Sequence, residues 1–559
     1  MKQSLKLSIL LLLALPFTVQ AQFISTGASF GSTKHVIFIG VDGLSPDGVR
    51  QASTPALDRL MNEGSYSLSA RGVRPTSSSP NWGSMLMGAA PEQHGVTSNG
   101  WREDRQPYPP NTKVGNRGWF PTIFDIIQDQ QPDMEVGTVY HWQGFQNLFN
   151  RETPDYEMHG RTEEITTQIA IDYIVEERPN YLFIHLDHVD AAGHRDGHGS
   201  DAYYESVSKA DSLIGLILSA LDETFGQEYV VMVSSDHGGV GYGHGGDSLA
   251  EIEIPWIISG KGVREGLDLQ SRINTFDSPS MAAYLLGIQQ PQAWIGRPVL
   301  ESLLGEEEPA FLYPANVVDP APLVSPISDS YIQFGGLFVD SADDIVIRNS
   351  NPDRESTIHY TLDGTEPTPE SPLYTDPIAI EDGLLLRAKQ FSGEQATSLE
   401  AQGSFRIVSA DVPKHVRVDF YEIEEVEALP DFSTMQPIHS TYTWEISLNH
   451  LDLPREENIA AVFTSFVEVK ESGTWRSVLA SDDGSKLFVN GIPLIDNDGN
   501  HGVIEVEGEA PIPAGVHELR VEWFNGGGGK WLGVFVEGPG MPYQEIPYSM
   551  YVANPNTYE

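Results

Sequence analysis

The strongest constraint on the fold is an alternation of strand and helix patterns across residues 34–304. Residues 35–40 form a continuous apolar run, which is typical of a strand covered on both faces. Alternation of strands and amphipathic helices predicts an α/β domain with a mostly parallel sheet flanked by helices. Ligands of such sheets lie at the carboxyl ends of the strands. The remaining patterns are helical over residues 162–177 and 203–221 and strand-like over residues 181–186, 229–233 and 254–258.

The character of the chain changes after residue 305. Residues 306–330 are rich in proline and acidic residues, which predicts a linker. Beyond them, short strand patterns are separated by Gly and Pro turns, and helical periodicity largely disappears. We therefore expect an α/β domain at residues 22–305 and two all-β sandwich domains, at residues 331–410 and 411–559.

The first residues of the chain resemble a secretory signal. Lys2 and Lys6 precede the apolar run 9–15, and residues 19–21 end in a small-residue cleavage signature. This predicts a signal peptide at residues 1–21 and a secreted or periplasmic protein. The apolar run is too short to span a bilayer, and no later stretch is long enough for a transmembrane segment after signal cleavage.

Charge and cysteine content limit the ligands that the chain can take. It has 33 Lys+Arg against 79 Asp+Glu, a net charge of −46, so it repels nucleic-acid polymers at long range. An anionic substrate must then be attracted locally, which suits a bound cation. Since there is no cysteine, a metal site must use His, Asp and Glu, and no disulfide stabilises the fold.

Carboxylate and imidazole side chains follow successive strand patterns. Imidazole and carboxylate without thiolate suit zinc or, less often, manganese or iron. Two such ions about 4 Å apart can hold the attacking and leaving oxygens of an in-line displacement. The candidate ligands are Asp42, Asp190, His194, Asp236, His237 and His244.

A run of hydroxyl side chains, residues 76–79, precedes Pro80 and Asn81. A hydroxyl bound to a metal ion loses its proton readily, so one of these residues is a candidate nucleophile. Spacing alone does not choose among Thr76, Ser77, Ser78 and Ser79.

Together these motifs resemble the alkaline phosphatase superfamily, most closely its nucleotide pyrophosphatase/phosphodiesterase branch. The resemblance covers about residues 34–304. Its motifs are Val41-Asp42-Gly43, Ser78-x-Pro80-Asn81, the glycine-bounded stretch 88–95, Asp190-x-x-Gly-His194, Asp236-His237-Gly238 and His244-Gly245.

The resemblance implies the roles of the site residues. Ser78 stands three residues before Asn81, the place of the family's nucleophile, although the branch usually has Thr there. Asn81 would donate a hydrogen bond to a phosphoryl oxygen. The chain is then a secreted two-zinc phosphoester hydrolase that acts on a small molecule through a phosphoserine intermediate. One zinc is held by Asp190, His194 and His244 and the second by Asp42, Asp236 and His237, with Ser78 as the bridging ligand.

Three alternatives stay open. A phosphate monoesterase of the alkaline phosphatase type would use the same ligands. A sulfatase has Cys or Ser followed by x-Pro-x-Arg, but Trp82 stands in place of that Arg, and three His ligands do not suit a single calcium ion. The last alternative is a non-catalytic protein that binds glycans.

The two β-rich regions carry resemblances of their own. Residues 361–367 and 386–389 resemble the chitobiase/hexosaminidase carboxyl-terminal module. Residues 479–487 and 513–517 are similar to the protective-antigen family of β-sandwich domains. The second resemblance implies a glycan partner and a calcium ion at Asp482 and Asp483.

Overall fold

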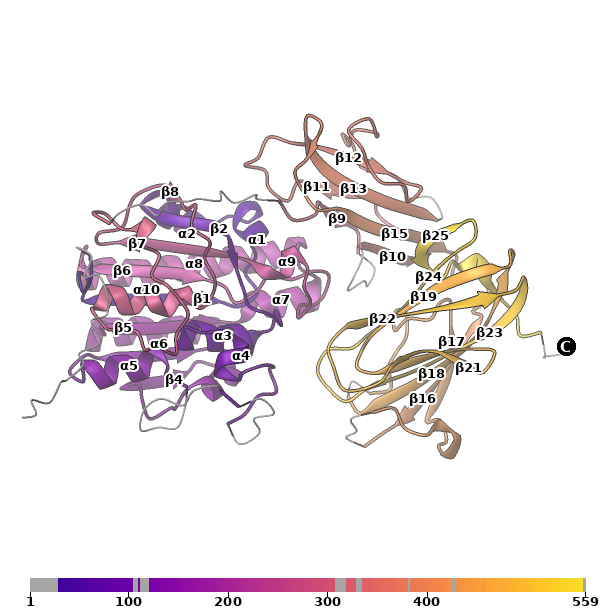
Figure 1. The fold of residues 1–559 in the computed structure, drawn as a ribbon, viewed down its shortest axis with the longest axis horizontal. Coiled ribbons are helices and arrows are strands. Elements are labelled where there is room, and N and C mark those ends of the chain that lie inside the picture. Colours follow the sequence, from indigo (N-terminus) through magenta and orange to yellow (C-terminus); the bar gives the residue numbers. More distant parts are fainter. Residues whose placement is uncertain are drawn as a thin grey trace, which may run out of the picture.

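The computed structural model places an α/β region, a small β region and a larger β region one after another (Figure 1). The predicted signal peptide, residues 1–21, and much of the predicted linker, 306–330, lie outside the described residues. The structure describes residues 29–103, 109–110, 120–306, 318–327, 334–380, 383–424, 428–455 and 457–555.

An eight-stranded sheet forms the centre of the α/β region, in the order β4-β3-β5-β1-β6-β7-β2-β8. The strands from β4 to β6 are parallel, and β7 is antiparallel to both of its neighbours. The predicted mostly parallel sheet is therefore confirmed. The strands are β1 (His35–Val41), β2 (Gly64–Arg71), β3 (Val136–Tyr140), β4 (Tyr156–His159), β5 (Tyr181–Leu186), β6 (Tyr229–Ser234), β7 (Glu253–Gly260) and β8 (Leu267–Asp268).

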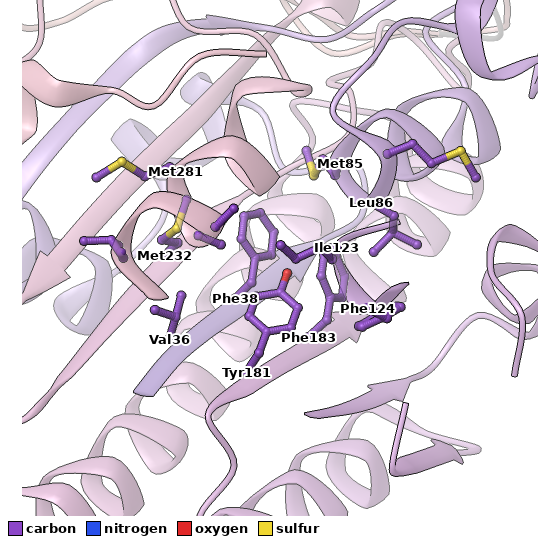
Figure 2. Close-up of a cluster of buried hydrophobic side chains, with 14 of the residues drawn as sticks. Val36, Phe38, Met85, Leu86, Ile123, Phe124, Tyr181, Phe183, Met232 and Met281 are labelled. Carbon is purple, nitrogen blue, oxygen red and sulfur yellow. The ribbon is translucent and has the colours of Figure 1, made fainter. Parts of the chain in front are cut away.

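Helices cover both faces of this sheet (Figure 1). Alternate residues of β1 point to opposite faces, because successive strand side chains do so. Phe38 packs in one buried cluster with Phe183 of β5, shown in Figure 2, and Ile37 and Ile39 pack in the other. The helices are α1 (Pro46–Gln51), α2 (Pro55–Asn62), α3 (Ser78–Met87), α4 (Pro91–His94), α5 (Ile123–Gln130), α6 (Glu163–Glu177), α7 (His188–Asp196), α8 (Asp201–Phe225), α9 (Leu249–Ile252) and α10 (Asp277–Leu286).

Part of the hydroxyl run is helical. Ser78 is the first residue of α3 and Ser77 is its N-cap. Pro80 does not interrupt this helix, because N–H groups of the first turn have no intrahelical partner that a proline would remove. The candidate nucleophile thus lies at the positive end of a helix dipole.

The second region is a small β module with its own core. Its larger sheet has the order β10-β15-β13-β12, and a separate pair joins β11 to β9. Ile345, Ile347, Leu386 and Phe405 are buried between them. The strands are β9 (Leu323–Ser325), β10 (Phe334–Val339), β11 (Val346–Arg348), β12 (Thr357–Thr361), β13 (Leu384–Ser392), β14 (Gln395–Ala396) and β15 (Ala401–Val408).

The third region is a sandwich of a seven-stranded and a four-stranded sheet. Phe463 and Trp523 of the first sheet share a core with Leu479 and Val534 of the second. Two β-rich regions after the α/β domain are therefore confirmed. The strands are β16 (Val416–Glu422), β17 (His439–Thr443), β18 (Ile459–Val469), β19 (Gly473–Asp482), β20 (Ser485–Val489), β21 (Ile492–Asn497), β22 (Ile504–Ile512), β23 (Gly515–Asn525), β24 (Trp531–Gly538), β25 (Met541–Glu545) and β26 (Tyr551–Val552).

Four short 3₁₀ helices complete the described elements: Gln143–Leu148, Leu300–Ser302, Phe432–Thr434 and Tyr548–Met550. No helix in the described part of the chain combines the length and the apolar character needed to span a bilayer.

A buried ion-pair network joins the second and third regions. Arg406 of β15 is 4% exposed, and its guanidinium lies 2.6 Å from Glu445 and 2.5 Å from Glu545. Leu337, Val408 and Trp444 form a small apolar cluster across the same boundary. Since a buried charge needs its partner, this network fixes the two β regions against each other.

Arg406→Ala should therefore destabilise the β-rich part of the chain by about 3–5 kcal/mol, because two carboxylates lose their counter-charge. The measurement is chemical unfolding followed by tryptophan fluorescence. Arg417→Ala is the control, since Arg417 is half-exposed beside Asp419 and should cost about 1 kcal/mol or less. Equal stability of the two variants would contradict a role for Arg406 between the regions.

Candidate metal centre

Six predicted ligands come together at the carboxyl edge of the sheet. β5, β1 and β6 are adjacent parallel strands, so the segments that follow them meet at one edge. Two groups of side chains there have ligand atoms within 4.8 Å of one another, and His237 belongs to both. One group contains Asp190, His237 and His244, and the other contains Asp42, Asp236 and His237.

The ring orientation of three histidines is set by backbone carbonyls. The Nδ1 atoms of His194, His237 and His244 each lie 2.8 Å from a carbonyl oxygen, those of Tyr242, Gly238 and Thr76 respectively. A carbonyl oxygen only accepts hydrogen bonds, so each Nδ1 carries a proton and each Nε2 faces the centre, where it can ligate a metal ion when it carries no proton of its own. This is the tautomer that metal-ligating histidines commonly adopt.

The Nε2 atoms of His194 and His244 lie only 3.1 Å apart. Burial lowers the pKa of His194, but the hydrogen bond and charge of Asp190 outweigh it and raise that pKa to about 9, so a protonated His194 ring can donate to His244 across this distance. Once that proton is lost, the same spacing fits a shared metal ion. Two nitrogens on a tetrahedral zinc ion lie about 3.3 Å apart, given Zn–N bonds of about 2.0–2.1 Å. Asp190 lies beside both of these rings. Its Oδ2 is 3.3 Å from Nε2 of His194, and its Oδ1 is 3.7 Å from Nε2 of His244.

The second group, Asp42, Asp236 and His237, contains buried carboxylate oxygens without hydrogen-bond partners. Nε2 of His237 lies 3.1 Å from Oδ2 of Asp236 and 3.5 Å from Oδ1 of Asp42. Oδ1 of Asp42, Oδ2 of Asp236 and Oδ1 of Asp190 are buried without a hydrogen-bond partner among the described residues. Burying a carboxylate oxygen without a partner is costly, and bound cations would satisfy all three atoms.

The shifted pKa values of Asp42 and His237 also show that these acids require nearby positive charge. Burial, together with repulsion from Asp236, raises the pKa of Asp42 to about 6. Burial lowers the pKa of His237, but the carboxylates of Asp236 and Asp42 outweigh it and raise that pKa to about 10. Without a metal, the His237 imidazolium thus supplies the positive charge that these acids require.

Ser78 lies beside this second group. Its Oγ is 3.5 Å from Nε2 of His237, and its side chain is buried at the start of α3. Thr76 has another role, since its Oγ1 donates to the carbonyl of Gly246 and accepts from the N–H of Gly245. The geometry therefore favours Ser78 over Thr76 as the candidate nucleophile.

Asn81 is directed away from the centre. It is 0% exposed, and its Oδ1 accepts the N–H of Val73 at 2.6 Å. Its amide nitrogen lies 3.0–3.2 Å from the carbonyls of Val73, Pro75 and Ser77. The expectation that Asn81 donates to a phosphoryl oxygen does not agree with this geometry, because the turn before α3 takes up its hydrogen bonds.

Asn99 is a candidate site residue that the sequence analysis missed. Its Oδ1 accepts the N–H of Ser79, 2.8 Å away, in the first turn of α3. This hydrogen bond holds an exposed amide NH₂ group near Ser78. In the sequence, only the turn-forming Asn99-Gly100 pair distinguishes this position, and such pairs are common in loops.

Two further residues hold Asp42 in place. The Trp82 indole N–H donates to Oδ2 of Asp42 at 2.9 Å, and Nε2 of His185 lies 3.2 Å from the same oxygen. Both side chains are 0% exposed. Trp82 therefore orients a candidate ligand carboxylate, which explains a large aromatic residue so close to the candidate nucleophile.

A cleft of about 850 Å³ extends from the centre toward the third region. His194 and Tyr242 line one side, and residues 448–451 and 528–530 line the other. A substrate group that projects from the centre would therefore reach residues of both regions.

The candidate calcium pair lies next to this cleft. Asp483 accepts the N–H groups of His501 and Gly526, at 3.0 and 2.9 Å. Burial and the neighbouring Asp483 raise the pKa of Asp482 to about 7, so a bound cation would favour its ionised form. A Cβ atom on Gly529, in the cleft wall, would lie 2.7 Å from Oδ2 of Asp482.

Three known families match the chain. Residues 36–252 match the type I phosphodiesterase/nucleotide pyrophosphatase family. Residues 345–401 match the family described as Fn3 associated, within the predicted β module at 331–410. Residues 439–549 match the PA14 domain, in the region similar to the protective-antigen family.

Individual relatives are distant. Ectonucleotide pyrophosphatase/phosphodiesterase family member 1 of Mus musculus is 24% identical over 194 residues, 33% of this chain and 21% of that protein. Member 3 of Bos taurus is 25% identical over 215 residues, 36% of this chain and 24% of that protein. The chain thus spans about a fifth to a quarter of these relatives. The solved structure of murine ectonucleotide pyrophosphatase/phosphodiesterase 5 has a TM-score of 0.40 at 16% identity, and covers 46% of this chain and 96% of its own.

Trp82→Phe should weaken metal binding about 10–100-fold, because Asp42 loses the donor that orients it. Competition against a chromophoric chelator measures this affinity. Trp256→Phe is a matched control, since Trp256 is also 0% exposed and its indole N–H donates to Ser278 instead. Unchanged affinity in Trp82→Phe would show that the hydrogen bond to Asp42 does not support the metal centre.

Proposed function

Since residues 36–252 carry a type I phosphodiesterase/nucleotide pyrophosphatase domain, we propose that this protein is a secreted, two-zinc phosphodiesterase. It cleaves small-molecule phosphodiesters or pyrophosphates through a phosphorylated Ser78. One zinc ion is held by Asp190, His194 and His244, and the other by Asp42, Asp236 and His237. The predicted signal peptide at residues 1–21 supports export.

The observation that carries this proposal is the opposed pair of imidazole nitrogens. His194 and His244 direct their Nε2 atoms at each other across 3.1 Å, beside an oxygen of Asp190 that has no hydrogen-bond partner in the described chain. That arrangement fits a cation. The family pattern and the position of Ser78 then support phosphoryl transfer.

The chain's own residues account for the steps. Ser78 attacks phosphorus in line, its Oγ–P bond forms, and the P–O bond to the leaving group breaks. The serine proton passes to solvent, and the leaving oxygen takes up a proton from water. Water then cleaves the phosphoserine and restores Ser78. Bound zinc ions would favour the serine alkoxide and stabilise the leaving oxygen.

The surroundings of Ser78 would stabilise the transition state. The exposed amide of Asn99 lies near Ser78, and the amino end of α3 contributes a positive dipole. Asn81 holds the preceding turn in shape, so it supports Ser78 indirectly.

Diester cleavage is favoured over monoester cleavage by the cleft. A diester carries a second organic group, and the cleft of about 850 Å³ offers space for it next to His194. Phosphate monoesterase activity remains the second candidate, because the same ligands serve both reactions.

The third region is proposed to bind calcium at Asp482 and Asp483 and to contact a glycan. The buried, adjacent carboxyl groups of Asp482 and Asp483 support the calcium ion, because a cation would favour the ionised form of Asp482. In the neighbouring loop, Asp498 and Asp496 already have a cationic partner, since Lys486 lies 2.9 Å and 3.5 Å from them.

Ser78→Ala should lower kcat for bis-p-nitrophenyl phosphate by about 10³-fold or more, because the nucleophile is lost. Zinc content, measured by mass spectrometry, should stay near that of the unsubstituted protein. Ser77→Ala is the control, since Ser77 is the neighbouring hydroxyl and makes no side-chain capping hydrogen bond. Comparison with p-nitrophenyl phosphate separates diester from monoester preference. Full activity of Ser78→Ala would exclude the phosphoserine route.

Asp482→Asn should abolish a calcium-dependent rise in thermal stability, because one carboxylate charge of the pair is removed. Differential scanning fluorimetry with and without CaCl₂ measures the effect. Asp496→Asn, whose carboxylate pairs with Lys486, should respond to calcium as the unsubstituted protein does. If calcium does not stabilise the unsubstituted protein, the site is excluded.

A further inference from the structure

A third group of potential ligands lies outside the proposed zinc pair. Ligand atoms of His141, Glu163 and His188 all lie within 4.8 Å of one another. His141 directly follows β3, Glu163 is the first residue of α6, and His188 is the first residue of α7. Because β3 and β5 are parallel neighbours, this group lies at the same edge of the sheet as the metal centre.

The ring of His188 needs a ligand that the described protein does not supply. His188 is 9% exposed, and neither ring nitrogen has a hydrogen-bond partner within the part of the chain that the structure describes. Its backbone is held in place, since its carbonyl accepts the hydroxyl of Ser206 at 3.0 Å. A buried polar group left without a partner costs about 1–3 kcal/mol.

The net charge around this group is negative, which favours a bound cation. Glu163 and Glu164 each place a carboxylate oxygen 2.5 Å from the same ammonium group, that of Lys209. Two carboxylates on one ammonium leave a net negative charge. Glu163 also retains a second carboxylate oxygen that can accept a metal ion.

We propose that His141, Glu163 and His188 bind a third divalent transition-metal ion. Two imidazoles and one carboxylate, without thiolate, form a donor set typical of zinc sites with an open fourth position. The site requires only its own three residues, so it does not depend on the proposed reaction.

The site adjoins the proposed zinc pair through Asp187. The N–H of Asp187 lies 3.4 Å from Nδ1 of His141. The Asp187 carboxylate belongs to a group with Asp42 and His185, and Asp42 is a proposed zinc ligand. A third ion at this site would therefore change the electrostatic potential at the proposed zinc pair through the Asp187 carboxylate.

Zinc content of the full chain tests the site. Protein stripped with a chelator, reloaded with zinc and passed through a desalting column should hold about three zinc ions per chain. His188→Gln and His141→Ala should each hold about two. The second variant alters a half-buried residue, so it also serves if His188→Gln fails to fold.

Glu163→Gln and Glu164→Gln form a matched pair. Both lose a carboxylate beside Lys209, but only Glu163 belongs to the ligand group. Glu163→Gln should lose one zinc ion, and Glu164→Gln should lose none. With cobalt in place of zinc, the visible absorption of the unsubstituted protein should exceed that of Glu163→Gln and equal that of Glu164→Gln.

Other outcomes would overturn the site. About two zinc ions in both the unsubstituted protein and His188→Gln would mean that ordered water, rather than metal, satisfies the His188 ring. About three ions in every variant would place the third ion elsewhere. Failure of the proposed function gives a different pattern, in which Asp190→Asn keeps its full zinc content while His188→Gln still loses one ion.

Discussion

The structure depends on how buried carboxylates and imidazole lone pairs are brought together. Asp42, Asp190 and Asp236 each bury an oxygen that has no hydrogen-bond partner among the described residues. The Nε2 atoms of His194 and His244 approach within 3.1 Å beside them. Unsatisfied polar atoms are costly to bury. Bound cations would remove that cost, and the spacing of the two imidazole nitrogens fits a shared ion.

The fold builds this arrangement with backbone groups and with buried side chains. Parallel β5, β1 and β6 end side by side, so the residues that follow them meet. Backbone carbonyls then fix the tautomer of each ligand histidine through Nδ1. Buried Trp82 and His185 both contact Oδ2 of Asp42. These hydrogen bonds are present without an ion, so they position the candidate ligands before any ion binds.

The sequence revealed those parts of the site whose signal is local. Asp42 and Asp236 could be recognised because each directly follows a strand pattern, and Asp190 and His194 because of their spacing. Trp82 and Asn99 could not, since their roles arise from contacts with Asp42 and Ser79, far away in the chain. The role expected for Asn81 failed because backbone groups of its own turn occupy its amide. The cleft shared with the third region depends on packing between regions, which no local pattern encodes.

The measurement that tests the metal centre most directly is anomalous X-ray diffraction at the zinc edge, on crystals of zinc-loaded protein. We expect one peak bounded by Asp190, His194 and His244 and a second bounded by Asp42, Asp236 and His237, close to Oγ of Ser78. Absence of density between the His194 and His244 rings, with the two Nε2 atoms still in contact, would contradict it.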